Sequence, residues 1–287
     1  MSTATAELKT EPVVFKAQKH LPEIDTSYNL TDEAIEHFRT KGFVKLKNVL
    51  SREVLDYYGR EITNWVHKLN RNTKPMEERD TYAKAFIQVG NIWTHSEIAK
   101  EFCFSRRLAK IASDLMGVKG VRMYHDQALY KEPSGGFTPW HADQFYWPLE
   151  TVNTCTVWIP MQKTPLEMGP LSFAVGSHKI DIGRDLVISD ESEKKISQAL
   201  EAKKLPMDEG PFDLGEVSYH YGWTFHRAGP NKSKHSRSVM TIIYMEDGIR
   251  VAQPKNSAQE NDLKGCLPGC KPGDMADSPI NPVIYRT

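Results

Sequence analysis

Residues 139–147 read PWHADQFYW, and this stretch places two metal-type ligands, His141 and Asp143, one residue apart among aromatic side chains. On a β-strand, residues i and i+2 project to the same side, so both can reach one ion while Ala142 points away. Two His and one carboxylate on one face bind mononuclear non-haem iron and leave positions open for a co-substrate and dioxygen. The stretch therefore predicts a strand that carries part of a metal site, although a lone His-x-Asp pair is also typical of an ordinary surface.

The third ligand of such a site must come from a later strand, and His226 in GWTFHRAGPN is the candidate. A chain with ten His always offers some later His, so this step alone is weak. His220 lies shortly before His226, and we expect it to be a second-sphere or structural residue. The remaining His are poorer candidates because they lie in the terminal or helical part, before the motif, after a Gly-Ser turn or in a Lys/Ser loop: His20, His37, His67, His95, His125, His178 and His235.

Arg237 is a second feature that favours a functional site. It begins the segment RSVMTIIYM, where strand alternation directs Arg237 and Thr241 to the same face. An arginine that points into a barrel needs an anionic partner, because an unpaired buried charge is very costly. A guanidinium matches a carboxylate bidentately, so an iron-bound 2-oxo acid whose far carboxylate meets Arg237 would satisfy both the metal and the arginine.

The pattern around these residues predicts strands after a helical block. Residues 31–116 carry helical signals, including Thr31 and Ser51 as N-caps and Gly42 as a helix stop. From residue 121 the period alternates, and Gly, Pro and Asn turns separate the candidate strands. These strands are 121–133, 153–161, 171–178, 215–221, 222–229 and 236–246. We predict a mainly β domain, an antiparallel barrel or sandwich with flanking helices.

The domain boundaries follow from the same reading. We expect a mobile N-terminal segment at 1–20 and a single domain at 21–287. Within that domain, 31–116 would be helical support, 120–250 the β core and 251–287 a C-terminal extension. The acidic and basic segment 184–209 is typical of a solvated helix and loop inserted between strands.

Composition limits the possible partners. Lys plus Arg and Asp plus Glu each total 37 in 287 residues, so charge gives no reason to expect nucleic acid or an anionic membrane. No apolar run approaches the ~18 residues of a membrane span. The four Cys, without an apolar leader, favour a reducing compartment, the cytoplasm. Cys266 and Cys270 lack a second pair at zinc spacing, so we interpret them as unpaired thiols. A small-molecule substrate, bound by a monomer or homodimer, is the expected partner.

Several stretches together resemble the phytanoyl-CoA dioxygenase family of iron(II)- and 2-oxoglutarate-dependent oxygenases. The resemblance runs from about residue 30 to the end, and the order and spacing of its motifs make it specific. The stretches are EHFRTKGFVKLKNVL, DQALYKEPSGGFTPWHADQFYW, TVWIPMQKTPLEMGPLSFAVGSH, GWTFHRAGPNKSKHSRSVMTIIYM and GCLPGCKPGDMADSPINPVIY. The family's fold is a double-stranded β-helix, also called a jelly roll, which agrees with the strand pattern above.

Position by position, the resemblance implies that His141, Asp143 and His226 bind Fe(II) and that Arg237 binds the distal carboxylate of 2-oxoglutarate. The resemblance also implies that three further residues line the co-substrate pocket: Trp158, Gln127 and Met123. Ala142 stands where a Gln is frequent in the family, at a position that we expect to point away from the metal. The carboxylate ligand is present, which argues against the halogenating variants of this fold.

The implied reaction uses O2 and converts 2-oxoglutarate to succinate and carbon dioxide while a substrate C–H bond is oxidised, with hydroxylation as the first expectation. For substrate contacts we choose Phe145 and Tyr146 from the motif and Trp93 from the apolar-aromatic segment 81–97. By strand parity, Phe145 and Trp147 would share the ligand face if the strand continues. The segment 81–97 could close over the cavity as a lid or form a packed helical turn.

Three alternatives stay open. The same cofactors support desaturation, epimerisation, ring formation and endoperoxide chemistry in secondary metabolism, and the sequence does not separate them. A non-catalytic jelly-roll protein that binds a metal or ligand would be expected to lose one of the ligands or Arg237. A zinc hydrolase would need a general base and would leave Arg237 unexplained. The substrate is not identified, but without a large basic cluster for coenzyme A we favour a free small molecule.

Overall fold

A computed structural model describes residues 19–72 and 74–287 of the chain. The expectation of a mobile segment at 1–20 falls outside the described residues, apart from the last two positions. None of the helices in the described part is both long enough and apolar enough to cross a membrane.

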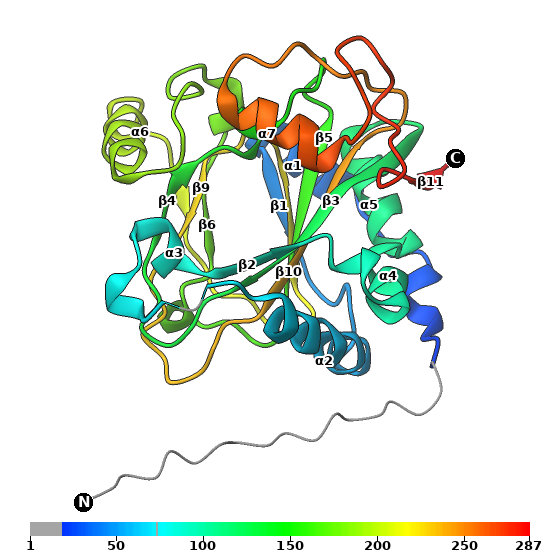
Figure 1. The fold of residues 1–287 in the computed structure, drawn as a ribbon, viewed down its shortest axis with the longest axis horizontal. Coiled ribbons are helices and arrows are strands. Elements are labelled where there is room, and N and C mark those ends of the chain that lie inside the picture. The colour runs from blue at the N-terminus through cyan, green and yellow to red at the C-terminus, as the bar shows by residue number, and fades with distance from the viewer. Residues whose placement is uncertain (1–18, 73) are drawn as a thin grey trace, which may run out of the picture.

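Two antiparallel sheets face each other (Figure 1). The large sheet has the order β1-β8-β5-β10-β3-β11, with β2 also paired to β3, and the small sheet has the order β4-β9-β6-β7. Each predicted strand region contains a strand of these sheets, so the mainly β jelly-roll prediction is confirmed. The strands are β1 (Phe43–Leu46), β2 (Ile87–Gly90), β3 (Gly120–Tyr130), β4 (Thr138–His141), β5 (Thr154–Pro160), β6 (Leu171–Ala174), β7 (Met207–Asp208), β8 (Val217–Tyr221), β9 (His226–Ala228), β10 (Val239–Glu246) and β11 (Val283–Arg286).

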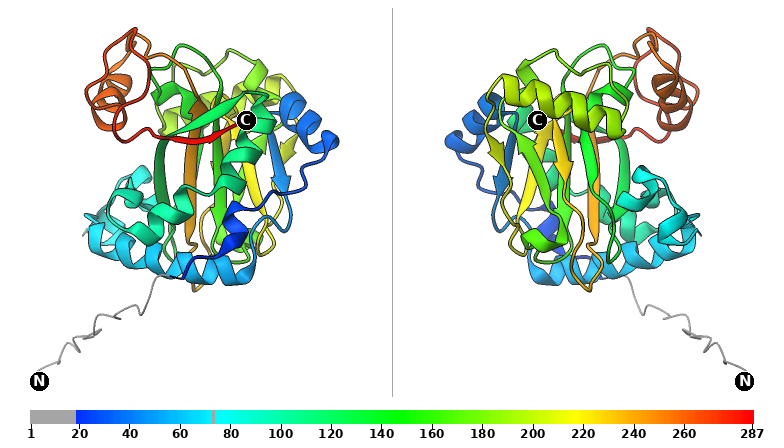
Figure 2. Two further views of the ribbon diagram at one scale, coloured as in Figure 1. Left: turned by 90° about the vertical axis from the view of Figure 1, so that its right-hand side faces the viewer. Right: turned by 90° about the vertical axis from the view of Figure 1, so that its left-hand side faces the viewer.

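Helices cover the sheets from outside. The α5 helix packs on β3, β5 and β10, while α6 packs on β4 of the small sheet. Figure 2 shows α2 near one end of the strands and α7 near the other. The helices are α1 (Asp32–Lys41), α2 (Arg52–Leu69), α3 (Thr81–Ala85), α4 (Glu97–Cys103), α5 (Arg106–Met116), α6 (Asp190–Ala202) and α7 (Ser257–Cys266), with short 3-10 helices η1 (Pro22–Asp25), η2 (Met76–Glu78), η3 (Ile92–Thr94), η4 (Asp143–Tyr146), η5 (Leu166–Met168) and η6 (Ser177–Lys179).

The predicted helix ends are present in the structure. The Thr31 side chain accepts a hydrogen bond from the Ala34 N–H, and Ser51 does the same for Val54. Gly42 ends α1 with a φ of 90°, a left-handed conformation that glycine adopts at little cost. Chain direction therefore changes at Gly42, where α1 gives way to β1.

A bulge in β3 decides which of its side chains face the space between the sheets. Ile243 of β10 pairs with His125 and the next residue, Tyr244, pairs with Met123, so Tyr124 is an extra residue. Such an extra residue reverses the alternation of side chains beyond it. His125 and Gln127 therefore face inward, whereas Met123 packs in the core between the large sheet and its helices.

The segment 81–97 contains three elements and not one packed helical turn. It forms α3, then β2, which pairs with β3, and then η3. The predicted helical support at 31–116 therefore also contributes β2, which extends the large sheet. Tyr82 and Phe86 at the start of this segment line the cavity described below.

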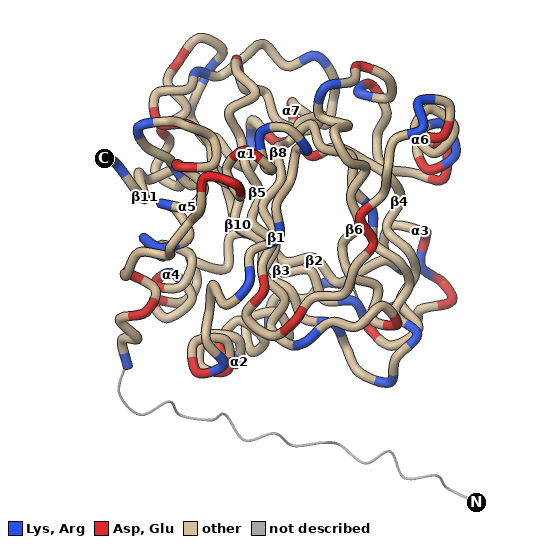
Figure 3. The backbone as a smooth tube through the Cα atoms, turned by 180° about the vertical axis from the view of Figure 1, so that it is seen from behind, with Lys and Arg blue, Asp and Glu red and all other residues tan. Residues whose placement is uncertain are grey.

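Charged residues of both signs are interspersed along the backbone seen from behind (Figure 3). The segment 184–209 contains α6, whose Ser189 N-cap forms a reciprocal capping box with Ser192. The predicted inserted helix is thus confirmed.

Candidate metal centre and co-substrate pocket

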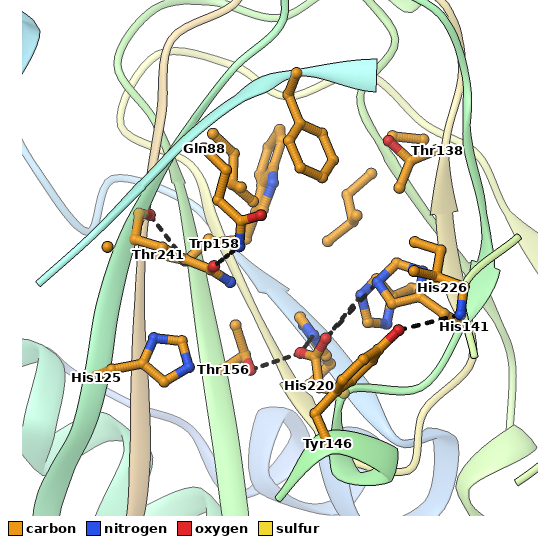
Figure 4. A pocket seen from close by; sticks show the side chains of 18 of the residues that line it. Gln88, His125, Thr138, His141, Tyr146, Thr156, Trp158, His220, His226 and Thr241 are labelled. Carbon is orange, nitrogen blue, oxygen red and sulfur yellow. Dashed lines mark hydrogen bonds and ion pairs between the residues drawn. The ribbon is translucent and has the colours of Figure 1, made fainter. Parts of the chain in front are cut away.

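Three predicted ligands meet between the sheets. His141 at the end of β4 lies opposite His226 at the start of β9, and Asp143 begins η4. The Oδ1 atom of Asp143 is 3.7 Å from Nε2 of His141 and 3.6 Å from Nε2 of His226. All three ligand atoms lie within 4.8 Å of one another. Figure 4 shows the two imidazole rings converging on this point from the small sheet.

The local backbone explains why both residues of the motif point inward. Ala142 is extended, with φ of −128° and ψ of 129°, so His141 and Asp143 still alternate as in a strand. The residues between and before them, Trp140 and Ala142, pack with Ile196 and Leu200 of α6 on the other side. The predicted strand ends at His141, however, and a 3-10 turn begins at Asp143.

The two His are held in the tautomer that a metal requires. The Nδ1 atom of His141 is 2.8 Å from the Pro139 carbonyl, and Nδ1 of His226 is 2.9 Å from the Thr224 carbonyl. A carbonyl only accepts, so each Nδ1 carries the hydrogen and each Nε2 presents a lone pair. Burial lowers the pKa of each imidazole to about 4, so both are neutral at neutral pH.

Asp143 is fixed by its second oxygen. Thr156 on β5 donates a hydrogen bond of 2.9 Å to Oδ2, and Nε2 of His220 on β8 lies 3.3 Å from the same atom. Burial alone would raise the pKa of Asp143, but His226, the hydrogen bond from His220 and His141 together hold it well below its usual range. Oδ1 is left to face the two imidazoles. The expectation of a second-sphere role for His220 agrees with this placement.

The donor set fits an iron(II) ion. Two neutral imidazole nitrogens and one ionised carboxylate oxygen form a facial set, and outer hydrogen bonds orient each ligand. A cavity of about 310 Å³ adjoins the three atoms, and all three residues line it. The space on that side can accommodate further ligands.

Arg237 lines the same cavity and is buried, with 1% of its surface exposed. One guanidinium nitrogen donates to the Gly169 carbonyl, Nε has no partner, and the group lies 5.4 Å from the Trp158 ring. In the described part of the chain, no carboxylate forms an ion pair with the Arg237 guanidinium. Burial lowers its pKa to about 9, so it remains charged at neutral pH.

Gly169, whose carbonyl accepts from Arg237, also lies close against the backbone of Gly229. Its φ is +65°, and a Cβ there would lie 2.1 Å from the Gly229 carbonyl oxygen. Lys131 also lies buried beside Arg237, where it donates to the Gly136 and Gly229 carbonyls. Burial and then the charge of Arg237 lower the pKa of Lys131 to about 6, which leaves Arg237 as the charged group of the pair.

Gln127 reaches the cavity from β3 as predicted. Its side-chain oxygen accepts a hydrogen bond from Gln88 of β2, and Gln88 in turn accepts one of 2.7 Å from Tyr82. The Thr241 hydroxyl donates to the Gln127 carbonyl at 3.0 Å. Figure 4 shows Gln88, Trp158 and Thr241 on the opposite side of the cavity from the ligands.

Two of the predicted substrate contacts lie elsewhere. The η4 turn ends the alternation, so Tyr146 and Trp147 line the cavity while Phe145 does not. Phe145 packs edge to face on Tyr146 instead. Trp93 lies in η3, against Phe104, and also lies outside the lining. The β3 bulge turns Met123 away from the cavity, so it does not line the co-substrate pocket. These three assignments, to substrate or to 2-oxoglutarate, are therefore corrected.

Other lining residues were missed. Thr156 could have been found, because it lies two positions before Trp158 on the same strand. Asp262 and Cys266 come from α7, far along the chain from the motif, and no local pattern connects them with it. The same is true of Ile188, whose N–H donates to the Tyr146 hydroxyl at 3.1 Å.

Two curated proteins are similar to this chain in sequence. A probable alpha-ketoglutarate-dependent hypophosphite dioxygenase of Stutzerimonas stutzeri is 25% identical over 74% of this chain and 77% of that protein. The phytanoyl-CoA dioxygenase domain-containing protein 1 of Danio rerio is 22% identical over 81% of this chain and 96% of its own length.

Solved structures share the fold. The non-heme alpha ketoglutarate dependent carbocyclase SnoK from nogalamycin biosynthesis superposes with a TM-score of 0.74, at 23% identity, over 90% of this chain and 97% of its own. The epimerase SnoN, in complex with Fe3+, alpha ketoglutarate and nogalamycin RO, gives 0.73 at 20% identity over 88% of this chain and 98% of its own.

Residues 38–239 match the family described as phytanoyl-CoA dioxygenase (PhyH). This match begins in the last turn of α1 and ends at the first residue of β10, and it includes every residue proposed to bind iron or the co-substrate. The chain belongs to the phytanoyl-CoA dioxygenase family of iron- and 2-oxoglutarate-dependent oxygenases.

Proposed function

We propose that this chain hydroxylates a C–H bond of a small organic molecule and releases succinate and carbon dioxide from 2-oxoglutarate. One observation carries the proposal: a complete His, Asp, His ligand set and a buried arginine without an anionic partner line one cavity. A protein that only bound a metal would not need the arginine, because its burial as a charge is costly.

The residues have separate tasks in this proposal. His141, Asp143 and His226 hold Fe(II), and Arg237 binds the distal carboxylate of 2-oxoglutarate in two hydrogen bonds. Gln127 and Trp158 form the wall beside the co-substrate. Iron with 2-oxoglutarate and O2 supplies the oxidising chemistry, while the chain binds, orients and excludes water.

A second candidate is favoured by the structural likeness. One neighbour is a carbocyclase and another is an epimerase, so the same fold supports outcomes other than hydroxylation. Desaturation and endoperoxide formation belong to this candidate as well. Hydroxylation adds one oxygen to the substrate, whereas desaturation or ring closure removes two hydrogens.

The reaction is proposed to take place in the cytoplasm. Four cysteines are free thiols in the structure: Cys103, Cys155, Cys266 and Cys270. Thiols without disulfides are typical of a reducing compartment.

The test measures succinate formation from 2-oxoglutarate by the purified chain with Fe(II) and O2, alone and with metabolite extracts. We expect His141→Ala to abolish iron-dependent turnover, while His235→Ala, which removes an exposed His, leaves it unchanged. Mass spectrometry of consumed extract components separates oxygen addition from hydrogen loss. If the wild-type chain forms no succinate with any extract, or if His141→Ala forms as much, the oxygenase function is wrong.

A further inference from the structure

The cavity contains a second charged side chain without a partner of opposite sign. Asp262 on α7 lines the cavity, and the Tyr124 hydroxyl donates a hydrogen bond of 2.5 Å to its Oδ2. Among residues 19–72 and 74–287, no Lys or Arg forms an ion pair with it. Burial raises its pKa above the usual value, although part of the residue remains exposed to solvent, and no Lys or Arg offsets the shift.

His125 on β3 does not supply the missing charge. Its ring lines the same cavity and points into it (Figure 4). Burial lowers its pKa, so the ring is neutral at neutral pH. Its Nδ1 is 3.4 Å from the Asp126 carbonyl, at the limit of a hydrogen bond, and Nε2 has no partner among the described residues. His125 therefore offers the cavity a hydrogen-bonding atom without a net charge.

The two unpaired groups match the two molecules that such a reaction needs. Arg237, just before β10 of the large sheet, suits the distal carboxylate of the co-substrate. Asp262, on α7, has the opposite sign and suits a positive charge on the other reactant. The aromatic rings of Tyr146 and Trp147 lie in the same lining and can cover a hydrocarbon body.

We propose that Asp262 binds a positively charged nitrogen of the substrate, so that the substrate class is a small organic amine with an apolar body. The assignment rests on the proposed oxygenase function and deepens it. The carboxylate compensates the desolvation of the ammonium group, and Nε2 of His125 can accept from a second N–H of the same nitrogen. Tyr124 continues to donate to the carboxylate and holds its orientation.

The probes are 2-phenylethylamine and 2-phenylethanol, which have the same shape and differ in charge. Each is titrated by calorimetry into the full chain loaded with Mn(II) and 2-oxoglutarate under argon at pH 7, so that no turnover occurs. A hydrogen bond to a charged group makes a larger contribution than a neutral one, so we expect the amine to bind about tenfold more tightly or better.

Two variants locate the preference. Asp262→Asn keeps the shape and an oxygen that can accept from Tyr124, and we expect it to lose the preference for the amine. Glu260→Gln removes an exposed carboxylate from the same helix and is expected to keep it. The thermal midpoint of each variant is measured to show that it is folded.

The outcomes separate this inference from the oxygenase function itself. Binding of 2-oxoglutarate to the metal-loaded wild-type chain is titrated first. If 2-oxoglutarate does not bind there, the proposed function is wrong. If 2-oxoglutarate binds but the amine has no advantage, or Asp262→Asn retains that advantage, the amine assignment is wrong and the function stands. Tighter binding of the alcohol likewise overturns it, since Asp262 would then act as a neutral group.

Discussion

The strand-built wall of the cavity and its rim are made in different ways. Wall residues such as His226, Thr156 and Arg237 lie on or beside strands that pair with neighbours, and their side chains have fixed hydrogen-bond partners. Rim residues such as Tyr82 and Ile188 come from short helices and connections between strands. A wall held by sheet hydrogen bonds keeps reactive groups in place, and a rim outside the sheets can change with the substrate.

The largest effect is expected at Arg237. Replacing Arg237 with Met removes the charge and keeps much of the length, so the far carboxylate of 2-oxoglutarate loses its buried partner. Loss of one member of such a pair costs about 2–5 kcal/mol, so we expect the KM for 2-oxoglutarate to rise about 30-fold or more. The measurement is succinate formation at saturating Fe(II).

Two controls make the Arg237 result specific. Arg237→Lys keeps the charge and should recover part of the affinity, although an ammonium lacks the bidentate fork. Stability of the Met variant without co-substrate should be equal to or above wild type, because an unpaired buried charge is gone. An unchanged KM in Arg237→Met would show that the arginine has no part in co-substrate binding.

The next prediction concerns Asp126, which lies on the face of β3 that points away from the cavity. The same strand supplies His125 and Gln127 to the wall. The Asp126 carboxylate accepts the N–H groups of Ile92 at 3.0 Å and Trp93 at 3.2 Å. Burial raises its pKa from 3.8 to about 7, although these two bonds oppose the shift. The folded state therefore binds more protons than the unfolded state in this window.

The free energy of unfolding should fall as pH rises from about 4 to about 7 and should level off at higher pH. The total decrease is at most about 4 kcal/mol for a fully buried group. Asp126→Asn should flatten this decline in urea unfolding at several pH values. Asp56→Asn, at an exposed position of α2, should leave the slope unchanged. The same slope in wild type and Asp126→Asn would refute the raised pKa.

A smaller effect is expected at Thr156, which contacts the metal site only through Asp143. Thr156→Val keeps the shape but removes the donor to Oδ2, and such outer-shell losses weaken metal affinity by about 10- to 100-fold. We expect a rise in the Fe(II) concentration needed for half-maximal activity, with the KM for 2-oxoglutarate little changed. Thr156→Ser should restore wild-type behaviour, and a Val variant with wild-type iron dependence would contradict the positioning role.

Most of the wall could be predicted from sequence and most of the rim could not, for a physical reason. Strand alternation is local, so His141, Asp143 and Arg237 followed from the residues around them. Met123, which the family resemblance implied, and Phe145, which strand parity favoured, lie outside the lining because the β3 bulge and η4 interrupt the alternation. Asp262 belongs to a helix whose contact with the cavity depends on the path of the whole C-terminal segment, which no short pattern encodes.

The smallest effect is expected at Tyr146, where wall and rim meet. Its hydroxyl accepts from the Ile188 N–H at 3.1 Å, so Tyr146→Phe frees one partly buried donor and should cost about 1 kcal/mol or less in urea unfolding. The ring remains to cover the cavity, and we expect the KM for 2-oxoglutarate to stay at its wild-type value while substrate affinity changes a few-fold at most. If Tyr146→Phe raised the KM for 2-oxoglutarate as strongly as Arg237→Met, the rim would contribute to co-substrate binding as much as the wall does. The distinction between a wall that holds the reactive groups and a rim that contacts the substrate would then be wrong.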